Sequence, residues 1–422
     1  MNSEQALEKI IEEYEKLRAE NAKKRENSIA IVYAKCPQIR EIDEKMNMLG
    51  QNTLREILKN PDLKGQAVCV LSNCDGCVIS RSKEAKKMGI PMGYPLFKAK
   101  EEFPNVIYLS SDMKFYHEMS KRVRKILRDF SPIVEVCSID EAFLDVTGLD
   151  KVYGVSGYEQ LAEMLSEKIF EETGIPVSVG IANSKILCKI ATDKAKKDKF
   201  YYYIPFEKIE EEISDYSVEK IWGVGRNITS LLKGHGLYTA GDILKRDKEF
   251  FEHFMGKRGL ELKFGLAGED TMPVSSAEVK PKSIQKTESF RKVTNDKELL
   301  KTSILEHLHN ACRKMRKYEL LTSEITVMLR TKDFRILSVT DKVKIPTNAE
   351  YLLNGKVIEM FEQIYFKNML YRSSGVYVGD FSDESVKQLS LLDNTEKFDS
   401  ISEIWDKIEA KHGRGVFSVG AR

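Results

Sequence analysis

Two short strand-like runs with adjacent carboxylates between them constrain this chain more than any other feature. Residues 134–137 and 142–146 are rich in β-forming residues, and only residues 138–141 (SIDE) separate them. Runs so close together are typical of a strand pair, which places Asp140 and Glu141 at its tip. Carboxylate oxygens are the hard ligands that Mg²⁺ prefers in proteins. An isolated Asp-Glu pair is more often a solvated hairpin end, so the flanking segments must decide between the two interpretations.

The size of the chain indicates several domains. Its 422 residues are too many for one compact core and suggest roughly two to four domains. Hydrophobic residues make up 42%, which supplies enough apolar material for real cores. A net charge of +2 neither requires nor excludes a nucleic-acid partner. No apolar run approaches the roughly 20 residues that span a bilayer, and the charged N-terminus is unlike a signal peptide, so we expect a cytoplasmic protein without a membrane partner.

The cysteines do not predict a metal site. Seven cysteines are sparse for this length, and in a reducing compartment we expect them to remain thiols. Cys74 and Cys77 form one CxxC. A zinc site of this kind usually needs a second CxxC or a spaced histidine pair, and the sequence shows no such partner.

Two segments together resemble a known family. Residues 131–143 (SPIVEVCSIDEAF) look like the palm motif of the Y-family DNA polymerases, which act in translesion synthesis and DNA repair. Residues 177–191 (VSVGIANSKILCKIA) look like the strand, turn and helix from which a lysine of that family reaches the incoming triphosphate. The resemblance implies that Asp140 and Glu141 are catalytic and bind two Mg²⁺ ions, which stabilise the attacking and leaving oxygens of nucleotidyl transfer.

The same resemblance extends to residues 71–82 and 89–95, which are similar to the fingers of the UmuC-type branch. Other branches often place a tyrosine and an arginine on the triphosphate here, whereas this chain has Lys83 and Lys86 at the corresponding positions, and lysine acts there as a point charge. The implied triphosphate-binding side chains are Lys83, Lys86, Lys185 and Lys189. Without the resemblance, the lysines on and after the helix at 185 would be an ordinary solvated face.

A glycine-containing helical region follows the palm. Residues 221–228 (IWGVGRNI) and 236–243 (GLYTAGDI) resemble the helix-hairpin-helix of a polymerase thumb. Glycines let such a turn bring backbone N–H groups close to phosphate oxygens, so Gly223 and Gly225 are expected to contact the DNA backbone. A helix C-cap followed by a loop explains the Gly-Val-Gly equally well.

The C-terminal third resembles the little-finger domain of the family. Residues 278–384 contain alternating strands and flanking lysines that suit a sheet laid on duplex DNA, and Lys282 and Ser283 are the expected contacts to the DNA backbone. Beyond them lies a short peptide that resembles the one with which bacterial polymerases bind the sliding clamp, a glutamine followed by apolar residues. Its residues are Gln388, Leu389, Ser390, Leu391 and Leu392.

The start of the palm departs from the family pattern. The family's first palm strand normally supplies a third metal-binding aspartate, and no such segment is recognisable ahead of Pro61. The only strand-like run is residues 29–34, and no carboxylate follows it until Glu41 and Asp43. We therefore expect helices to replace this strand, and the hypothetical replacement ligand is Asp145 or a carboxylate from the N-terminal helices. Loss of a ligand between two ions would weaken metal occupancy and activity.

The predicted fold is α+β, with a right-hand polymerase architecture and an added little finger. The expected parts are a helical extension at 1–58, fingers at 59–105, palm at 106–205, thumb at 206–270, little finger at 278–384 and a tail with the clamp peptide at 385–422. Within the extension, residues 25–50 weakly resemble DnaC-like helicase loaders, although a helical extension without separate function explains them as well.

The sequence is compatible with three functions. The first is a DNA-directed DNA polymerase, with primer-template DNA, including damaged DNA, deoxynucleoside triphosphates and the sliding clamp as partners. RecA-like or UmuD-like accessory proteins remain open. The second is a catalytically impaired protein that binds damaged DNA and the clamp, which the missing aspartate would favour. The third is a replisome-loading adaptor that acts through residues 1–58. Primer extension separates the first from the second.

Overall fold

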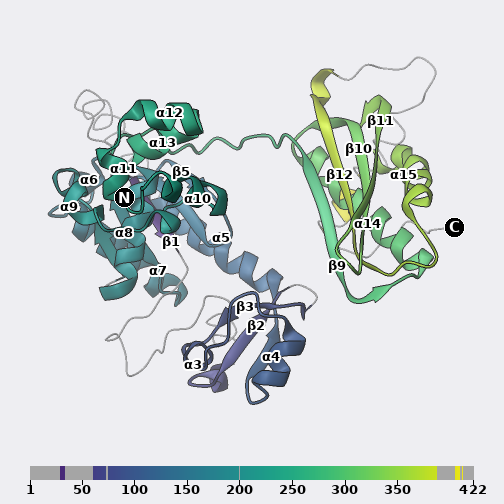
Figure 1. The fold of residues 1–422 in the computed structure, drawn as a ribbon, viewed down its shortest axis with the longest axis horizontal. Helices are drawn as coiled ribbons and strands as arrows, with labels where there is room; N and C mark the ends of the chain where they lie inside the picture. The colour runs from purple at the N-terminus through teal and green to yellow at the C-terminus, as the bar shows by residue number, and fades with distance from the viewer. Residues whose placement is uncertain are drawn as a thin grey trace. The chain divides into compact units, whose positions relative to one another are not determined.

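The chain divides into two compact units, Met1–Ala277 and Glu278–Arg422, which are drawn in Figure 1. The computed structural model describes residues 29–33, 60–72, 75–198, 200–386, 404–408 and 411. Most of the predicted N-terminal extension, Cys74 and the clamp peptide lie outside these residues. No helix of the described part is both long and apolar enough to cross a membrane.

A five-stranded sheet forms the centre of the first unit, in the order β5-β6-β1-β7-β8. Its strands are β1 (Ile29–Tyr33), β5 (Val134–Val136), β6 (Glu141–Asp145), β7 (Ser178–Ala182) and β8 (Tyr201–Tyr203). β1 lies antiparallel to both β6 and β7, whereas β8 is parallel to β7. The antiparallel pair of β5 and β6 is the strand pair predicted around the two carboxylates.

The expectation that helices replace the first palm strand is wrong, because residues 29–33 form the middle strand of this sheet. The run Ile-Ala-Ile-Val-Tyr is apolar and rich in β-branched residues, which favour strands. On the β6 side, Ile29 pairs with Asp145 and Tyr33 pairs with Glu141. Pairing on both edges decides the structure of a short segment whose neighbours in the sequence have a helical pattern.

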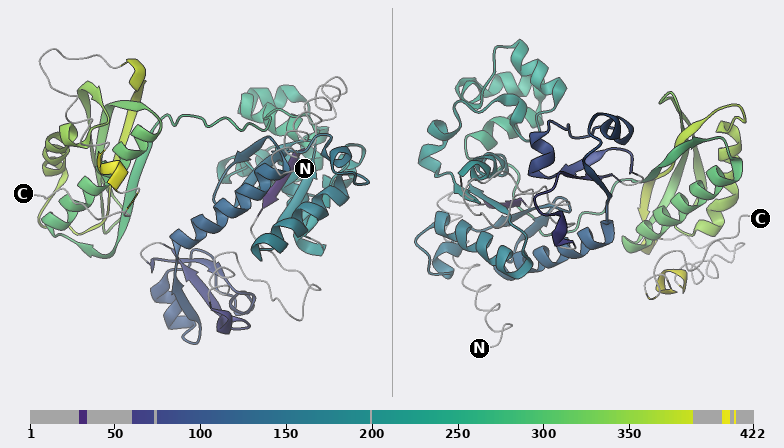
Figure 2. Two further views of the ribbon diagram at one scale, coloured as in Figure 1. Left: turned by 180° about the vertical axis from the view of Figure 1, so that it is seen from behind. Right: turned by 90° about the horizontal axis from the view of Figure 1, so that it is seen from below.

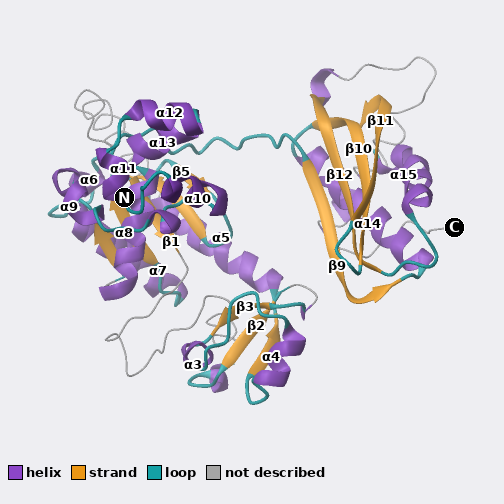
Figure 3. Ribbon diagram, in the orientation of Figure 1, coloured by secondary structure: helices purple, strands orange, loops and turns teal. Residues whose placement is uncertain are grey.

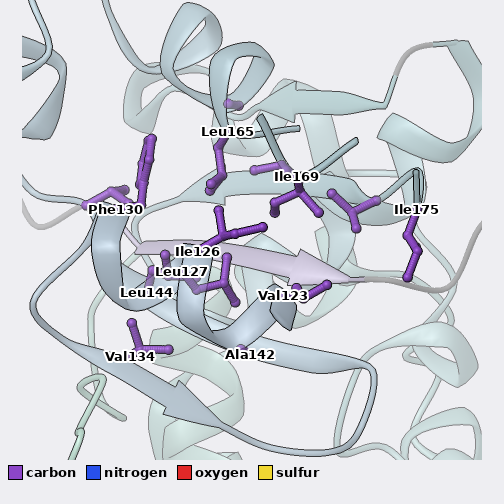
Figure 4. Close-up of a cluster of buried hydrophobic side chains, with 14 of the residues drawn as sticks. Val123, Ile126, Leu127, Phe130, Val134, Ala142, Leu144, Leu165, Ile169 and Ile175 are labelled. Atoms are coloured by element: carbon purple, nitrogen blue, oxygen red, sulfur yellow. The ribbon is translucent and has the colours of Figure 1, made fainter. Parts of the chain in front are cut away.

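Helices cover both faces of the central sheet. α5 (Met113–Phe130) and α7 (Tyr158–Thr173) pack on one face, and α8 (Lys185–Asp198) packs on the other. β6 shows the alternation of a strand with two buried faces. Leu144 joins the apolar cluster of α5 and α7, part of which Figure 4 shows, and Phe143 joins the cluster that contains α8.

A smaller sheet in the order β3-β2-β4 has an apolar core of its own. Its elements are β2 (Val68–Leu71), β3 (Val78–Arg81), β4 (Ile107–Ser110), α3 (Lys83–Lys87) and α4 (Leu96–Glu102), with the short 3-10 helix η1 (Pro61–Leu63) ahead of them. Ser82 begins α3, because its hydroxyl accepts a hydrogen bond from the Ala85 N–H. β4 pairs parallel with β2.

Short helices follow the central sheet and share an apolar core with α8 and Phe143. They are α9 (Ile209–Ile213), α10 (Arg226–Gly234), α11 (Ala240–Lys245), α12 (Lys248–Met255) and α13 (Lys257–Leu266), with the 3-10 helices η3 (Phe206–Lys208) and η4 (Val218–Lys220), while α6 (Leu149–Val152) follows β6. α11 begins with a capping box, in which the Thr239 hydroxyl and the Asp242 carboxylate each accept a hydrogen bond from the other residue's N–H.

The second unit is an antiparallel sheet in the order β11-β10-β12-β9, with two helices on one face. Figures 2 and 3 show both helices on the same side of the strands. The elements are β9 (Ile284–Thr294), α14 (Lys297–Lys317), β10 (Leu320–Thr331), β11 (Ile336–Thr347), α15 (Glu350–Ile364), β12 (Tyr371–Asp383) and the 3-10 helix η5 (Glu384–Val386). Arg316 of α14 binds Asp406 through two hydrogen bonds of 2.7 and 2.9 Å, which fixes the helical residues 404–408 to this unit.

Candidate active site

The carboxylate pair lies on a turn that α5 holds in place. Asp140 ends the turn before β6, and Glu141 is the first residue of that strand. The Ser120 hydroxyl donates to the Ile139 carbonyl at 2.6 Å, and the Arg124 guanidinium donates to the Ser138 carbonyl at 3.1 Å. Two side chains from one helix therefore fix the backbone immediately before the carboxylates.

Two lysines of α8 reach two glutamates on the neighbouring strands. Lys189 Nζ lies 2.6 Å from Glu141 Oε1, and Lys185 Nζ lies 2.7 Å from Glu135 Oε2. The lysines are four residues apart and so occupy one face of the helix. Phe143 pairs with Glu135 across β5 and β6 and lies two residues after Glu141 on β6, so the three side chains share one face of the sheet.

Aromatic rings enclose these ion pairs. Lys185 Nζ is 5.2 Å from the centre of the Phe143 ring, and Lys189 Nζ is 5.8 Å from that of Trp222. The rings of Phe143 and Trp222 contact each other at 5.7 Å. The side chains of Lys189 and Glu141 are only 15% and 19% exposed. Partial desolvation strengthens the attraction between the two charges.

Gly180 of β7 allows α8 to come this close. A Cβ atom on Gly180 would lie 2.5 Å from both the Cys188 carbonyl oxygen and Thr192 Oγ1, and 2.6 Å from the Thr192 nitrogen. The helix backbone therefore fills the space of a side chain. Any larger residue would push α8, and with it the lysines, away from the strands that carry the glutamates.

Other acidic and thiol groups surround Lys185. Glu135 Oε2 also accepts a hydrogen bond from the Ser275 N–H at 2.9 Å. Burial raises the pKa of Asp270, whose Oδ1 has no hydrogen-bond partner, while the charge of Lys185 opposes that rise. Burial, followed by the charge of Glu135, raises the pKa of the Cys137 thiol, which keeps it protonated at neutral pH.

The third metal ligand is not supplied by the strands around Glu141. β1 contains no carboxylate, and its Tyr33 is the residue in register with Glu141. The hypothesis that Asp145 replaces the ligand is wrong, because it lies four residues along β6, about 13 Å away, where its Oδ1 accepts from the Thr147 N–H. Among the described residues, no three or more His, Cys, Asp and Glu side chains form a group suited to a metal ion.

Asp140 and Glu141 nonetheless fit one common kind of magnesium site. Mg²⁺ is often held by one or two carboxylates together with substrate phosphates, and not by a complete protein cage. Glu141, with Lys189 at 2.6 Å, and the adjacent Asp140 would supply oxygen ligands for the ion and positive charge for a phosphate group. The donor set thus suits an ion that is shared with a phosphorylated substrate.

The other predicted site residues lie on separate elements. Lys83 and Lys86 are on α3 of the smaller sheet. Gly223 has a left-handed backbone (φ +88°), and Gly225 is the N-cap of α10, so this glycine begins a helix and does not end one. Neither glycine has an atom within 4 Å of the position of a Cβ. Lys282 and Ser283 are exposed residues of the second unit, just before β9.

A pocket of about 250 Å³ adjoins the glycine turn. It lies between α8, α10 and α13, and its lining includes Ile186, Trp222, Gly223, Ile228 and Leu262. Trp222 therefore lines this pocket and also contacts the ammonium group of Lys189. The sequence motif contained this tryptophan, but its spacing gave no reason to place it beside Lys189.

Several residues of the site were not predicted. Glu135 lies in the palm motif between Val134 and Val136, and this alternation of apolar and charged residues is a signal that its side chain lies on the opposite face from theirs. Ser120, Arg124 and Asp270 lie far from the motif in the sequence, and no local pattern connects them with it.

The site combines carboxylates of a palm-like sheet with two lysines of α8, and comparison with known proteins identifies the family. Residues 53–193 match the impB/mucB/samB family, and residues 281–391 match the C-terminal domain of that family. The chain belongs to this family of Y-family DNA polymerases.

Curated relatives agree with this assignment. Protein UmuC of Salmonella typhimurium strain LT2 is 30% identical over 381 residues, which cover 86% of this chain and 89% of the relative. A DNA polymerase IV of Dehalococcoides mccartyi is 28% identical and covers 85% of this chain and 92% of its own length. The predicted family and enzyme class, a DNA-directed DNA polymerase of the translesion type, are therefore confirmed.

Solved structures confirm the fold class. A Y-family DNA polymerase chimera of Dbh and Dpo4 aligns with a TM-score of 0.64 at 27% identity, over 84% of this chain and 98% of its own. A Dbh ternary complex aligns with a TM-score of 0.56 at 26% identity, over 83% of this chain and 98% of its own. The predicted α+β right-hand architecture with a little finger is thus confirmed.

Proposed function

We propose that this chain extends a primer along damaged template DNA, with Asp140 and Glu141 as the ligands of two Mg²⁺ ions. The observation that carries the proposal is the convergence of Glu141 and Lys189, 2.6 Å apart, at the tip of the palm hairpin. When bound, the magnesium ions supply charge stabilisation for the attacking and leaving oxygens. Deoxynucleoside triphosphates and primer-template DNA are the substrates.

The remaining predicted residues bind the substrates in this proposal. Lys83, Lys86, Lys185 and Lys189 neutralise the triphosphate, each as a point charge. The turn at Gly223 and Gly225 contacts the DNA backbone through N–H groups, and the absence of any atom within 4 Å of a Cβ position on either glycine leaves room for a phosphate group. Lys282 and Ser283 make further backbone contacts from the second unit.

We assign the parts of the chain by the same proposal. Residues 59–105 form the fingers, 106–205 the palm, 206–270 the thumb and 278–384 the little finger. Residues 385–422 form the tail, in which Gln388, Leu389, Ser390, Leu391 and Leu392 bind the sliding clamp. RecA-like or UmuD-like proteins are the accessory partners. The adaptor function proposed for residues 1–58 falls outside the described residues, apart from β1.

Primer extension on undamaged and abasic templates tests the proposal. The double variant Asp140→Ala/Glu141→Ala should lose at least about a hundredfold in rate, because metal ligands supply several kcal/mol of charge stabilisation. The control is Glu171→Ala/Glu172→Ala, which removes two adjacent carboxylates from the exposed last turn of α7.

Three outcomes separate the functions. Extension that survives in the control and is lost in the palm variant establishes the proposed chemistry. Extension that survives in both variants would refute the assignment of Asp140 and Glu141. An unaltered chain that binds primer-template DNA without extending it would support the catalytically impaired alternative.

A further inference from the structure

The ion pair between Lys189 and Glu141 occupies atoms that the proposed function needs elsewhere. Lys189 Nζ donates a hydrogen bond of 2.6 Å to Glu141 Oε1. In the proposed function, which this inference builds on, Glu141 binds a divalent cation and Lys189 binds a phosphate group. Glu141 and Lys189 cannot keep their ion pair while Glu141 binds the cation and Lys189 binds the phosphate.

The structure shows why the ammonium group rests on the carboxylate. Both side chains are mostly buried, at 15% and 19% exposure, and a buried carboxylate without a cation nearby is costly. The ring of Trp222 lies 5.8 Å from Lys189 Nζ and screens the pair on one side. In the absence of a divalent ion, Lys189 is therefore the cation that satisfies Glu141.

We infer that Lys189 is a built-in counter-ion of Glu141 that competes with the divalent cation and is released to the nucleotide phosphates when the cation binds. Like charges repel, so an ammonium on Oε1 lowers the affinity of Glu141 for a second cation. A nucleotide draws the ammonium away and removes the competition. Metal and nucleotide consequently bind with positive cooperativity, and Lys189 carries the coupling.

Lys189→Met should raise the affinity for the cation and lower the affinity for the triphosphate. Lys189→Met keeps the length of the side chain and removes its charge. Without nucleotide, this variant should bind the cation more tightly than the unaltered chain does. Its affinity for a triphosphate should fall, because it has lost a phosphate-binding charge. A residue that only stabilised the fold would not move the two affinities in opposite directions.

Lys185 provides a matched control within the same helix. It has the same residue type, lies one turn earlier and forms an ion pair of 2.7 Å, but its partner is Glu135 and not a carboxylate of the hairpin tip. Lys185→Met should therefore change the cation affinity much less than Lys189→Met does. Lys189→Arg keeps the charge and should bind the cation as the unaltered chain does.

The experiment measures Mn²⁺ binding to the full chain by electron paramagnetic resonance, first without nucleotide and then with a non-hydrolysable deoxynucleoside triphosphate. Lys189→Met should raise the Mn²⁺ affinity about three- to tenfold without nucleotide. The nucleotide should raise the Mn²⁺ affinity of the unaltered chain more than that of Lys189→Met. Glu141→Gln should abolish the tight site, and circular dichroism checks that each variant is folded.

Two results would overturn the inference. One is an unchanged or lower Mn²⁺ affinity of folded Lys189→Met without nucleotide. The other is tight Mn²⁺ binding that Glu141→Gln leaves intact, since the cation would then bind elsewhere. Primer extension is a separate readout: a chain that shows the predicted Mn²⁺ and nucleotide coupling but extends no primer contradicts the proposed function and leaves the counter-ion role supported.

Discussion

Gly180 of β7 packs directly against the backbone of α8, so a methyl group added there should have a defined cost. In Gly180→Ala, the added Cβ would meet the Cys188 carbonyl oxygen and Thr192 Oγ1 at 2.5 Å, and the Thr192 nitrogen at 2.6 Å. Ordinary contact requires the helix to retreat by about 1 Å. β7 cannot retreat instead, because it is hydrogen-bonded to β1 and β8 on its two edges.

The expected cost is set by the kind of atoms that must move. Two of the three are helix backbone, which has no rotamer to adopt, so we expect a loss near the upper end of the about 1–3 kcal/mol typical of overpacking. Gly234→Ala is the control, since the position of its Cβ has no atom within 4 Å and its residue ends α10. That change should be neutral or stabilise by up to about 1 kcal/mol.

Urea unfolding followed by tryptophan fluorescence measures the difference. The chain has two tryptophans, Trp222 in the first unit and Trp405 in the second. A Trp405→Phe background leaves Trp222 as the reporter of the unit that contains Gly180. A loss in Gly180→Ala smaller than about 0.5 kcal/mol would refute the argument that α8 is packed without space against β7. In the folded variant, kcat/KM for extension should fall by up to about a hundredfold, because both lysines shift with the helix.

Two further predictions concern the second unit. Burial lowers the pKa of His307 below its ordinary value near 6.5, so below pH 6.5 the unfolded chain binds more protons than the folded chain does. The free energy of unfolding should therefore fall as the pH falls below 6.5, by at most about 1.4 kcal/mol per pH unit. Midpoints of urea unfolding at pH 7.5 and 5.5 test this, and His307→Gln should make the midpoint less dependent on pH. Arg316→Met should destabilise by about 3–5 kcal/mol, because it leaves Glu350, which is 5% exposed, without its guanidinium partner at 2.8 Å. The neighbouring Lys317→Met, whose pair with Glu278 is exposed, should leave the midpoint of urea unfolding nearly unchanged.

The palm hairpin could be predicted from the sequence because its signals are local. The strand runs of β5 and β6 flank Asp140 and Glu141 directly, and the lysines of α8 lie within one motif. Lys189 and Glu141 are 48 positions apart in the sequence, and only the resemblance to a family placed them in one site. Their ion pair was not predicted and is seen only in the structure.

The strand-like run at residues 29–34 was visible in the sequence, but its place in the palm sheet could not be predicted, because that place depends on tertiary pairing with β6 and β7. Residues 29–33 are five apolar residues, a length at which a strand and a buried helix segment have the same pattern. Residues 29–33 form a strand because they hydrogen-bond to β6 on one side and to β7 on the other. Both partners lie far along the chain, so the sequence near residues 29–33 does not contain them. The anchoring of the turn by Ser120 and Arg124 was missed for the same reason.

The ion pair between Lys189 and Glu141 and the small number of carboxylates at the hairpin tip have a common explanation. The tip of the palm hairpin offers two carboxylates, Asp140 and Glu141, and Tyr33 stands in register with Glu141 where a further carboxylate could have stood. A magnesium site of two carboxylates is completed by substrate phosphates, so it is incomplete until a nucleotide arrives. In the proposed counter-ion role, Lys189, at 2.6 Å, satisfies Glu141 in the meantime. Because Gly180 sets the distance between α8 and the strands, a methyl group there should weaken this exchange even at temperatures where the variant is fully folded, whereas a defect of stability alone would disappear under those conditions.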